Sequence, residues 1–311
     1  MPNPRITVMG SFITDLVFRA TRLPAWGETL FGSDFMLGPG GKGSNQAVAA
    51  ARLGGRAAFI SKLGRDAFAD LARRTWAAEG IDARFVLETA DAPTGAASIV
   101  VNEASGHNAI VVVPGSGLQL TADDVDRARE AIEGAAIFLT QLETPLAAVR
   151  RALRLARSCG VRTILNPAPA LPLPDDVYPL CDVLTPNESE TAALVGHPVE
   201  SLADAQRAAD TLLGRGAGAV ILTLGARGAL VRTAAVTRHV AALDAGPVVD
   251  TTGAGDAFNG GLAIGLAEGL DVVAATRLGC ATAAISVTRP GTAPAMPARA
   301  EVDALLSRSG S

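Results

Sequence analysis

Two stretches of the sequence combine residue types that bind phosphate in other proteins. The first, "LGPGGKGSNQAVAAARLGG" (37–55), contains the pair Gly41–Lys42 among further glycines, with a hydroxyl residue nearby. A phosphate-binding P-loop needs a glycine five positions before the Gly of this pair and Ser or Thr directly after the Lys. Met36 and Gly43 occupy those positions, so the stretch is not a P-loop. A dinucleotide-binding fingerprint opens the first strand–helix unit, whereas about thirty residues precede this one, so Lys42 needs another role.

The second stretch is "VVDTTGAGDAFNGGLAIGLAEG" (248–269), in which a glycine turn leads into a helical pattern. Gly253 and Gly255 allow a tight turn, and a helix that starts there presents free N–H groups and a positive dipole end to an anion. Asp256 then lies in the first helical turn, beside the anion. Phosphoryl transfer to an alcohol needs such donors together with a base that takes up the hydroxyl proton. The alternative is that Asp256 only caps the helix.

Composition limits the class of protein. Of the 311 residues, 49% are apolar and 19% charged, which predicts one large domain with a buried core and at most a small appendage. The net charge of −4 gives no basic surface, so we expect no nucleic acid and no membrane as partner. No segment resembles a signal peptide or a membrane-spanning helix, which predicts a soluble, cytoplasmic protein. The three cysteines, Cys159, Cys181 and Cys280, lack metal-ligand spacing and are expected to be free thiols.

Short apolar runs alternate with helical patterns along most of the chain. The runs expected to be strands are 5–9, 57–61, 135–139, 161–165, 181–185 and 218–223. They lack strict polar alternation, as is typical of strands buried on both faces. Helices are expected to begin at the N-caps Ser44, Thr121 and Ser201 and to end at glycines. This alternation predicts an α/β fold with a mostly parallel sheet covered by helices.

Two segments interrupt the alternation and have strand-like composition. They are 12–37 and 94–113, and the second predicts a hairpin around 104–107. They can pair into a small β lid or form two separate edge hairpins. With a lid, the chain divides into an α/β nucleotide- and sugar-binding body (1–11, 38–93 and 114–311) and a β lid (12–37 and 94–113).

The quoted stretches resemble the two signatures of the PfkB, or ribokinase-like, carbohydrate kinases. Five more motifs, in the same order, are similar to the ribokinase branch of this family: "QLETP" (141–145), "LNPAPA" (165–170), "TPNESE" (185–190), "LTLGARG" (222–228) and "ISVTRPGTAPAMP" (285–297). The resemblance covers nearly the whole chain. It implies a doubly wound α/β body with a small β-sheet lid, and a homodimer formed through that lid.

The resemblance also implies a role for the first stretch, which binds the sugar in this family. The residues that match the sugar site are Asp15, Gly40, Gly41, Lys42, Asn45, Glu143 and Asp256. Lys42 is therefore interpreted as a sugar-side residue held by Glu143. One position departs from the pattern, because Ile13 stands where the ribokinase branch has Asn. An apolar side chain cannot pair with a buried hydroxyl, so the identity of the sugar stays open.

The remaining site residues also follow from the resemblance. Asp256 matches the catalytic base, and Gly253, Ala254 and Gly255 match the anion hole. Asn187 and Glu190 match residues that organise Mg²⁺ and the nucleotide phosphates, with Glu190 acting indirectly. The ATP site is implied at Asn187, Thr223, Gly225, Ala226, Arg227, Gly228, Gly255 and Cys280. An activating K⁺ ion is implied at Asp250, Thr252, Ser286, Arg289, Gly291 and Ala295, although a Ser is expected at the last position.

These observations predict an ATP-dependent kinase that phosphorylates the terminal primary hydroxyl of a pentose, converting D-ribose to D-ribose 5-phosphate. Its partners would be the sugar and ATP, with Mg²⁺ and K⁺ as cofactors. A kinase for 2-deoxyribose, another monosaccharide or a nucleoside remains an alternative. A non-catalytic sugar-binding protein would not require Asp256, Asn187 and the glycine turn together, and a nicotinamide dehydrogenase would require a fingerprint that is absent.

Overall fold

The structure is a computed structural model that describes residues 3–310. Within these residues, a nine-stranded sheet forms the centre of the fold. Its strands are β1 (Arg5–Met9), β4 (Arg56–Leu63), β5 (Asp82–Glu88), β8 (Ile137–Thr140), β9 (Arg162–Leu165), β10 (Val183–Leu184), β11 (Ala219–Thr223), β12 (Ala229–Thr233) and β13 (Thr237–Val240). Their order is β13-β12-β11-β10-β9-β8-β1-β4-β5, and all neighbouring strands pair parallel except β12, which is antiparallel to both β11 and β13. Carboxyl ends of the parallel strands therefore meet at one edge of the sheet.

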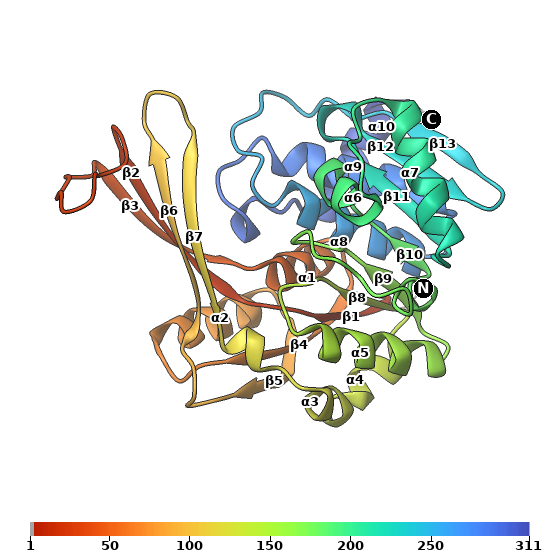
Figure 1. Cartoon of the computed structure of the whole chain (residues 1–311), viewed down its shortest axis with the longest axis horizontal. Helices are drawn as coiled ribbons and strands as arrows, with labels where there is room; N and C mark the ends of the chain where they lie inside the picture. The colour runs from red at the N-terminus through yellow and green to blue at the C-terminus, as the bar shows by residue number, and fades with distance from the viewer. Residues whose placement is uncertain (1–2, 311) are drawn as a thin grey trace.

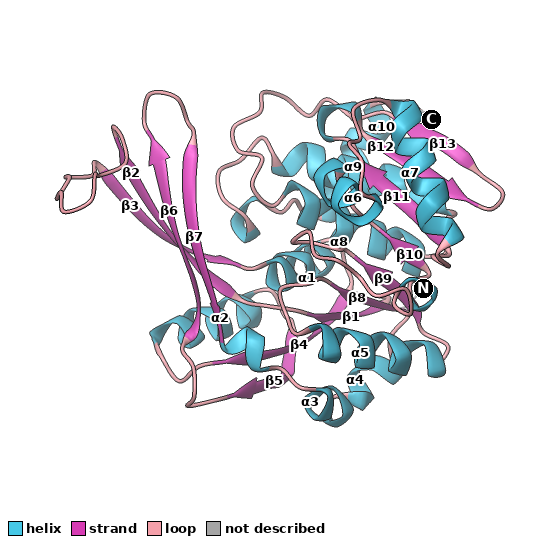
Figure 2. Ribbon diagram, viewed as in Figure 1, coloured by secondary structure: helices cyan, strands magenta, loops and turns pink. Residues whose placement is uncertain are grey.

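Helices cover both faces of this sheet (Figure 2). One face packs against α1 (Lys42–Arg52), α2 (Ala67–Ala78), α8 (Ala254–Ala267), α9 (Val272–Ser286) and α10 (Arg299–Arg308). The other packs against α3 (Ala122–Arg127), α4 (Arg129–Glu133), α5 (Leu146–Ser158), α6 (Glu188–Val195) and α7 (Leu202–Gly214). Short 3₁₀ turns occur at Ser116–Gln119, Tyr178–Leu180, Gly225–Arg227 and Ala293–Ala295. Ile6 and Val8 belong to one core and Met9 to the other, since successive strand residues point to opposite faces.

A second, smaller sheet lies apart from the first. It consists of β2 (Ile13–Ala20), β3 (Asp34–Gly40), β6 (Thr94–Asn102) and β7 (Asn108–Gly115) in the order β3-β2-β6-β7. Figure 1 shows these long strands extending away from the helix-covered body at the left of the view. β6 and β7 form an antiparallel hairpin in which Val101 pairs with Asn108. The predicted fold class, a mostly parallel covered sheet with a small separate sheet, is confirmed, and so is the hairpin.

Local sequence patterns predicted most of the elements. All six expected strands are present, and Thr121 and Ser201 cap α3 and α7, each within a capping box. The N-cap predicted at Ser44 is wrong, because α1 begins at Lys42 and its N-cap is Gly41. Ser44 is buried instead, and its hydroxyl accepts a hydrogen bond of 2.9 Å from the Trp76 indole.

Two further features concern the environment of the chain. Among residues 3–310, none of the helices has the length and apolar character needed to cross a lipid bilayer. The three cysteines are free thiols, as expected, and Cys181 and Cys280 are buried.

Candidate active site

The two signature stretches meet at the carboxyl edge of the large sheet. Helix α1 lies within the first stretch and α8 within the second, and the two helices pack side by side (Figure 1). Asn45 and Gln46 of α1 each donate a hydrogen bond of 2.9 Å to Asp256, to Oδ2 and Oδ1 respectively. A side chain at Gly260 of α8 would clash with Ala49 of α1, so this glycine allows the close approach. The fold thus places the predicted base beside the predicted sugar loop.

The glycines of the first stretch allow contact between backbone segments. Gly41 has a φ of 86°, and a Cβ added there would lie 2.7 Å from the Ile13 nitrogen. A Cβ added at Gly43 would lie 2.6 Å from the Gly10 Cα atom. The loop is therefore pressed against residues 10–13, where β1 leads into β2, which explains the glycines without a bound phosphate.

Lys42 is mostly buried at the start of α1, among carboxylates. Burial lowers the pKa of its ammonium, but the negative charges of Asp256, Glu143 and Glu190 outweigh this effect and leave the pKa raised. The ammonium is therefore charged at neutral pH. Because three carboxylates surround it, Lys42 supplies the main positive charge of this region.

Glu143 lies directly after the β8 end of the sheet and is held by two donors. Its carboxylate accepts hydrogen bonds from the Ser11 hydroxyl and, at 2.9 Å, from the Lys42 backbone N–H. Burial raises the pKa of Glu143, against the charge of Lys42 and these two donors. Sequence reasoning expected Glu143 to hold the Lys42 side chain. The hydrogen bond instead involves the Lys42 backbone, and no salt bridge of Lys42 is found within residues 3–310.

Asp15 brings a carboxylate from the small sheet to the same region. A side chain at Gly40 would clash with this carboxylate, so Gly40 makes room for it. The Thr292 hydroxyl lies 3.3 Å from Asp15 Oδ2 and 2.9 Å from the Pro39 carbonyl oxygen. Burial raises the pKa of Asp15 to about 6; the Thr292 hydrogen bond opposes this shift, and nearby carboxylates add to it.

Ile13 lies two residues before Asp15 on β2, so both side chains point to the same face of the small sheet. Ile13 is buried and packs with Ala97 and Ile99 in an apolar cluster. The position that departs from the ribokinase pattern is thus an apolar surface next to the Asp15 carboxylate.

The start of α8 has the features of an anion site. Gly253, its N-cap, has a φ of 78°. Within residues 3–310, the N–H groups of Gly255 and Asp256 donate no hydrogen bond, and a Cβ added at Gly255 would meet nothing within 4 Å. These donors are therefore open to a ligand, with Ala254 between them and the N-cap. Burial raises the pKa of Asp256, against the Lys42 charge and the amides of Asn45 and Gln46.

Asn187 and Glu190 occupy the start of α6. Asn187 caps the helix, and Glu190 accepts hydrogen bonds from the Asn187 N–H at 2.8 Å and its amide at 3.0 Å. The pair thus forms a capping box, a structural role that sequence reasoning did not assign. Burial raises the pKa of Glu190, and the charges of Lys42 and Asp256 also act on it. A backbone bridge between Asn187 and Thr223 joins this pair to the predicted ATP loop.

The predicted ATP loop follows β11. Gly225, Ala226 and Arg227 form a 3₁₀ turn, and Gly228 has a φ of 91°. Arg227 is ion-paired with Glu188 of α6. Cys280 lies on α9, and its thiol is packed in the apolar core.

The predicted potassium loops contact each other directly. Asp250 accepts hydrogen bonds from the N–H groups of Thr252 at 2.9 Å and Gly291 at 3.0 Å. In the described chain, the carbonyl oxygens of Asp250, Thr252, Arg289 and Gly291 accept no hydrogen bond, whereas that of Ser286 accepts one from the Arg289 N–H. Four carbonyls are therefore available to a cation. Ala295, the remaining predicted ligand, is buried.

Sequence reasoning missed several polar residues of this region. They are Ser11, Gln46, Gln141, Asn166, Asn259 and Thr292. All except Ser11 belong to stretches quoted for the family resemblance, and Gln46 directly follows Asn45 in the first of them. The signal that could have found them is a polar amide or hydroxyl within an otherwise apolar or small-residue run, because buried polar groups need partners.

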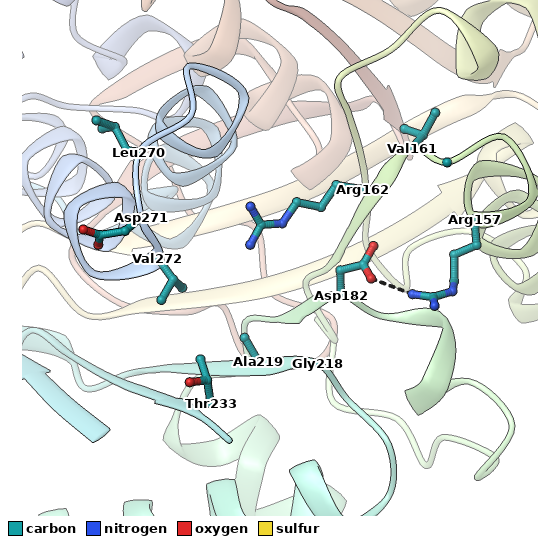
Figure 3. Close-up of a pocket in the computed structure, with 11 residues that line it drawn as sticks. Arg157, Val161, Arg162, Asp182, Gly218, Ala219, Thr233, Leu270, Asp271 and Val272 are labelled. Atoms are coloured by element: carbon teal, nitrogen blue, oxygen red, sulfur yellow. Dashed lines mark hydrogen bonds and ion pairs between the residues drawn. The ribbon is translucent and has the colours of Figure 1, made fainter. Parts of the chain in front are cut away.

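A cavity away from these residues has a different lining. It has a volume of about 660 Å³ and is lined at the amino ends of β9, β10 and β11 by Arg157, Arg162, Asp182 and Asp271, among others (Figure 3). Figure 3 shows the ion pair between Arg157 and Asp182 at its rim. Two arginines and two aspartates balance in charge, and none of the predicted site residues lines this cavity. We therefore place the chemistry at the opposite, carboxyl edge of the sheet.

Comparisons with known proteins agree with this geometry. The family model "pfkB family carbohydrate kinase" matches residues 3–299. The mouse (Mus musculus) ribokinase is 41% identical over 306 residues, covering 97% of this chain and 94% of that protein. A Salmonella typhi deoxyribokinase is 38% identical over 303 residues, covering 97% of this chain and 98% of that protein.

A solved structure gives the same result for the fold. The Arabidopsis thaliana ribokinase complexed with ribose and ATP superposes with a TM-score of 0.91 at 30% identity, covering 97% of this chain and 98% of that one. Sequence match and superposition both extend over almost the whole chain, including the small sheet. The protein is therefore a member of the pfkB family of carbohydrate kinases.

Proposed function

We propose that the protein transfers the γ-phosphoryl group of ATP to the terminal primary hydroxyl of a pentose, with D-ribose as the first substrate and D-ribose 5-phosphate as the product. The observation that carries this proposal is the start of α8. There a buried carboxylate with a raised pKa, Asp256, lies beside N–H groups that have no partner in the described chain. Relatives named ribokinase support the choice of sugar.

In the proposed reaction, Asp256 takes up the proton of the sugar hydroxyl as that oxygen attacks the γ-phosphorus. A raised pKa suits this task, because a base near the working pH accepts a proton most effectively. The N–H groups of Gly255 and Asp256 donate to the phosphoryl oxygens, and the α8 dipole favours their negative charge. Lys42 supplies a positive charge that acts on Asp256 and favours its ionised form, against the effect of burial.

The sugar would bind between the small sheet and the start of α1. Asn45 is buried, its amide donates to Asp256, and its oxygen has no partner within the described residues, so this oxygen can accept a sugar hydroxyl. The carboxylates of Asp15 and Glu143 are further acceptors in this region. Gly40 and Gly41 let the loop pack closely against Asp15 and Ile13, and their backbone groups are proposed to contribute to the sugar site.

ATP and Mg²⁺ are proposed at the α6 and β11 side of the site. Glu190 is a buried carboxylate in electrostatic contact with Lys42 and Asp256, and Asn187 holds it in place. Carboxylate and amide oxygens are the ligand types of Mg²⁺, which keeps several waters, so an indirect role of Glu190 fits this donor set. Mg²⁺ bound with ATP would neutralise phosphate charge. The residues proposed to bind ATP are Asn187, Thr223, Gly225, Ala226, Arg227, Gly228, Gly255 and Cys280.

An activating K⁺ ion is proposed between the loops 250–252 and 286–295. The unpaired carbonyl oxygens of these loops suit a large, weakly hydrated cation, and Asp250 already joins the loops through Thr252 and Gly291. The ion would order the backbone next to the glycine turn rather than contact the substrate. Ala295 offers no side-chain oxygen, so a water would complete that side.

A second candidate substrate is 2-deoxyribose. Ile13 presents an apolar surface beside Asp15, and one of the relatives is a deoxyribokinase. An apolar group loses nothing when a hydroxyl is absent from the sugar, whereas it leaves a present hydroxyl unpaired.

We also propose that two copies associate through the small sheet, in the cytoplasm. One face of this sheet carries Phe18, Phe35, Leu37, Val111 and Val113, each at least 40% exposed. A contiguous apolar face without charges can meet its own copy without electrostatic repulsion. Light scattering should therefore give a dimer mass for the wild type and a monomer for Val111→Lys. Leu202→Lys, an exposed leucine of α7, is the matched control and should remain dimeric.

The test of the activity is incubation with Mg²⁺, ATP and a panel of sugars. We expect ADP release with D-ribose and a product phosphorylated at the 5-position, identified by phosphorus NMR. Release of ADP with none of the pentoses, deoxypentoses or nucleosides would reject the proposal.

A further inference from the structure

The two oxygens of the Asp256 carboxylate accept hydrogen bonds from two different side-chain amides. Oδ1 accepts from Gln46 and Oδ2 from Asn45, both at 2.9 Å. The two donors are neighbours on α1, yet their other hydrogen bonds differ. This difference determines which oxygen of Asp256 can lose its amide donor and bind a ligand instead.

Gln46 is held from three sides and is completely buried. Its oxygen accepts a hydrogen bond of 2.5 Å from the Gln141 amide, and its nitrogen also donates to Asn166 at 3.2 Å. Asn166 is fixed in turn by its donation to the Thr185 carbonyl at 2.9 Å. Rotation of the Gln46 amide would leave several buried polar groups unpaired, which is costly in the protein interior.

Gln141 is constrained by the space around it, although its side-chain oxygen has no hydrogen-bond partner in the described residues. It is completely buried directly after β8, and a side chain at Gly10 would clash with its oxygen. The absence of a side chain at Gly10 therefore leaves space for the Gln141 amide. Gln141, Gln46 and Asp256 form a chain of amides and carboxylate from the centre of the large sheet to the start of α8.

Asn45 is held only at one end. Its nitrogen donates to Asp256 Oδ2, while its oxygen has no hydrogen-bond partner in the described residues. Asn45 can therefore turn toward a ligand without breaking any other bond. Oδ2 then loses its donor and is free to accept a proton.

We propose that Gln46, held by Gln141, is a positioning residue that fixes Oδ1 of Asp256, and that Oδ2 is the oxygen that takes the proton from the sugar hydroxyl. This inference rests on the proposed role of Asp256 as general base. In the step, the hydroxyl O–H bond breaks and the proton moves to Oδ2. The sugar oxygen bonds to the γ-phosphorus, the bond from that phosphorus to the bridging oxygen breaks, and ADP leaves with the bond's electron pair.

The pH dependence of the reaction separates this role from a structural one. An amide that donates to a carboxylate favours its charged form, so the Gln46 hydrogen bond lowers the pKa of Asp256. Loss of the donor raises that pKa. Because only the ionised carboxylate can act as a base, the acidic limb of the kcat/KM profile then moves to higher pH.

The main variant is Gln46→Met, which keeps about the same volume and removes the donor to Asp256 without adding a charge beside that carboxylate. At pH 7 we expect kcat/KM to fall by at least about tenfold, with recovery toward alkaline pH and a KM for ATP within about twofold of wild type. Gln141→Met, which does not touch Asp256, should shift the acidic limb in the same direction by a smaller amount.

The matched control is Thr276→Val on α9. Thr276 is also completely buried and loses one hydrogen bond, to the Val272 carbonyl, on substitution. It should reduce thermal stability without moving the pH profile. An unmoved acidic limb in both glutamine variants, or an equal shift in Thr276→Val, would overturn the inference. A wild type without kinase activity would instead reject the proposed function.

Discussion

Asn45 Nδ2 lies 2.9 Å from Asp256 Oδ2, although 211 positions separate the two residues in the chain. This hydrogen bond joins the start of α1, which presents the predicted sugar residues, to the start of α8, which presents the predicted base. A sugar held at Asn45 is therefore next to the carboxylate that would deprotonate it. Proximity of this kind can account for a large part of a rate enhancement.

The first prediction concerns Asp256 itself. Asp256→Asn keeps the size and the polar contacts of the side chain but removes its ability to accept a proton. We expect kcat to fall by at least about a hundredfold, the lower range for general acid–base catalysis, while sugar and ATP still bind. Steady-state kinetics and calorimetric titration of both ligands measure the two effects. Turnover close to wild type would show that another group takes the proton.

The second prediction uses the pKa of Asp15, which burial raises to about 6. The folded protein then binds more protons than the unfolded chain between about pH 4 and pH 6, so stability falls as the pH rises through this window. Asp15→Asn removes this loss and should stabilise the unliganded protein above pH 6 by up to about 3 kcal/mol, from two pKa units.

Thermal unfolding of wild type and Asp15→Asn at pH 4 and pH 8 provides the measurement. The difference in Tm between the two proteins should be small at pH 4 and large at pH 8, since at pH 4 Asp15 is neutral in the folded protein and only about half ionised in the unfolded chain. The variant should also bind ribose more weakly, because a sugar acceptor is lost. An equal Tm difference at both pH values would contradict the raised pKa.

Sequence analysis predicted correctly those helices and strands whose ends are determined by residues nearby in the sequence. Thr121 and Ser201 cap their helices by accepting a hydrogen bond from the N–H of the third residue that follows, and a strand such as 218–223 is marked by its own apolar run. Ser44 was misassigned because the loop before α1 is fixed by contact with residues 10–13, far away in the sequence. An N-cap pattern cannot detect such a contact.

The same distinction applies to the site. Asp256 and Gly253 were predicted because the turn and the helix start are local. The hydrogen bonds among Gln46, Gln141 and Asn166 join residues about a hundred positions apart, and amide partners follow from the tertiary fold alone. The division into body and lid, and the role of Lys42 in sugar binding, remain predictions.

The third prediction is activation by potassium. Asp250 joins the two loops whose carbonyl oxygens are unpaired, and these loops flank the glycine turn. Exchange of sodium for potassium at constant ionic strength should raise kcat severalfold. Asp250→Asn, which weakens the link to Gly291, should reduce this activation. Equal rates in both salts would show that no potassium site is present. The lack of a side-chain oxygen at Ala295 would then explain its absence.

The fourth prediction concerns Ile13, which is 4% exposed and packs with Ala97 and Ile99. Its side chain points to the same face as Asp15, so it borders the proposed sugar site. Because Ile13 offers no hydrogen bond, we expect 2-deoxyribose to be used within about tenfold of ribose, a difference of roughly 1.4 kcal/mol. Ile13→Asn should restore a donor and move the preference toward ribose.

The decisive quantity is the ratio of kcat/KM for the two sugars in three proteins: wild type, Ile13→Asn and Ile13→Val. Ile13→Val keeps an apolar surface and should keep the wild-type ratio, so it controls for the loss of packing against Ile99. Ile13→Asn also places an amide in an apolar cluster, which lowers stability by about 1–3 kcal/mol but acts equally on both sugars. A change in the ratio therefore reports contact with the 2-hydroxyl rather than damage to the small sheet. If the wild type already selects ribose strongly and Ile13→Asn selects it no more, a residue other than Ile13 recognises that hydroxyl.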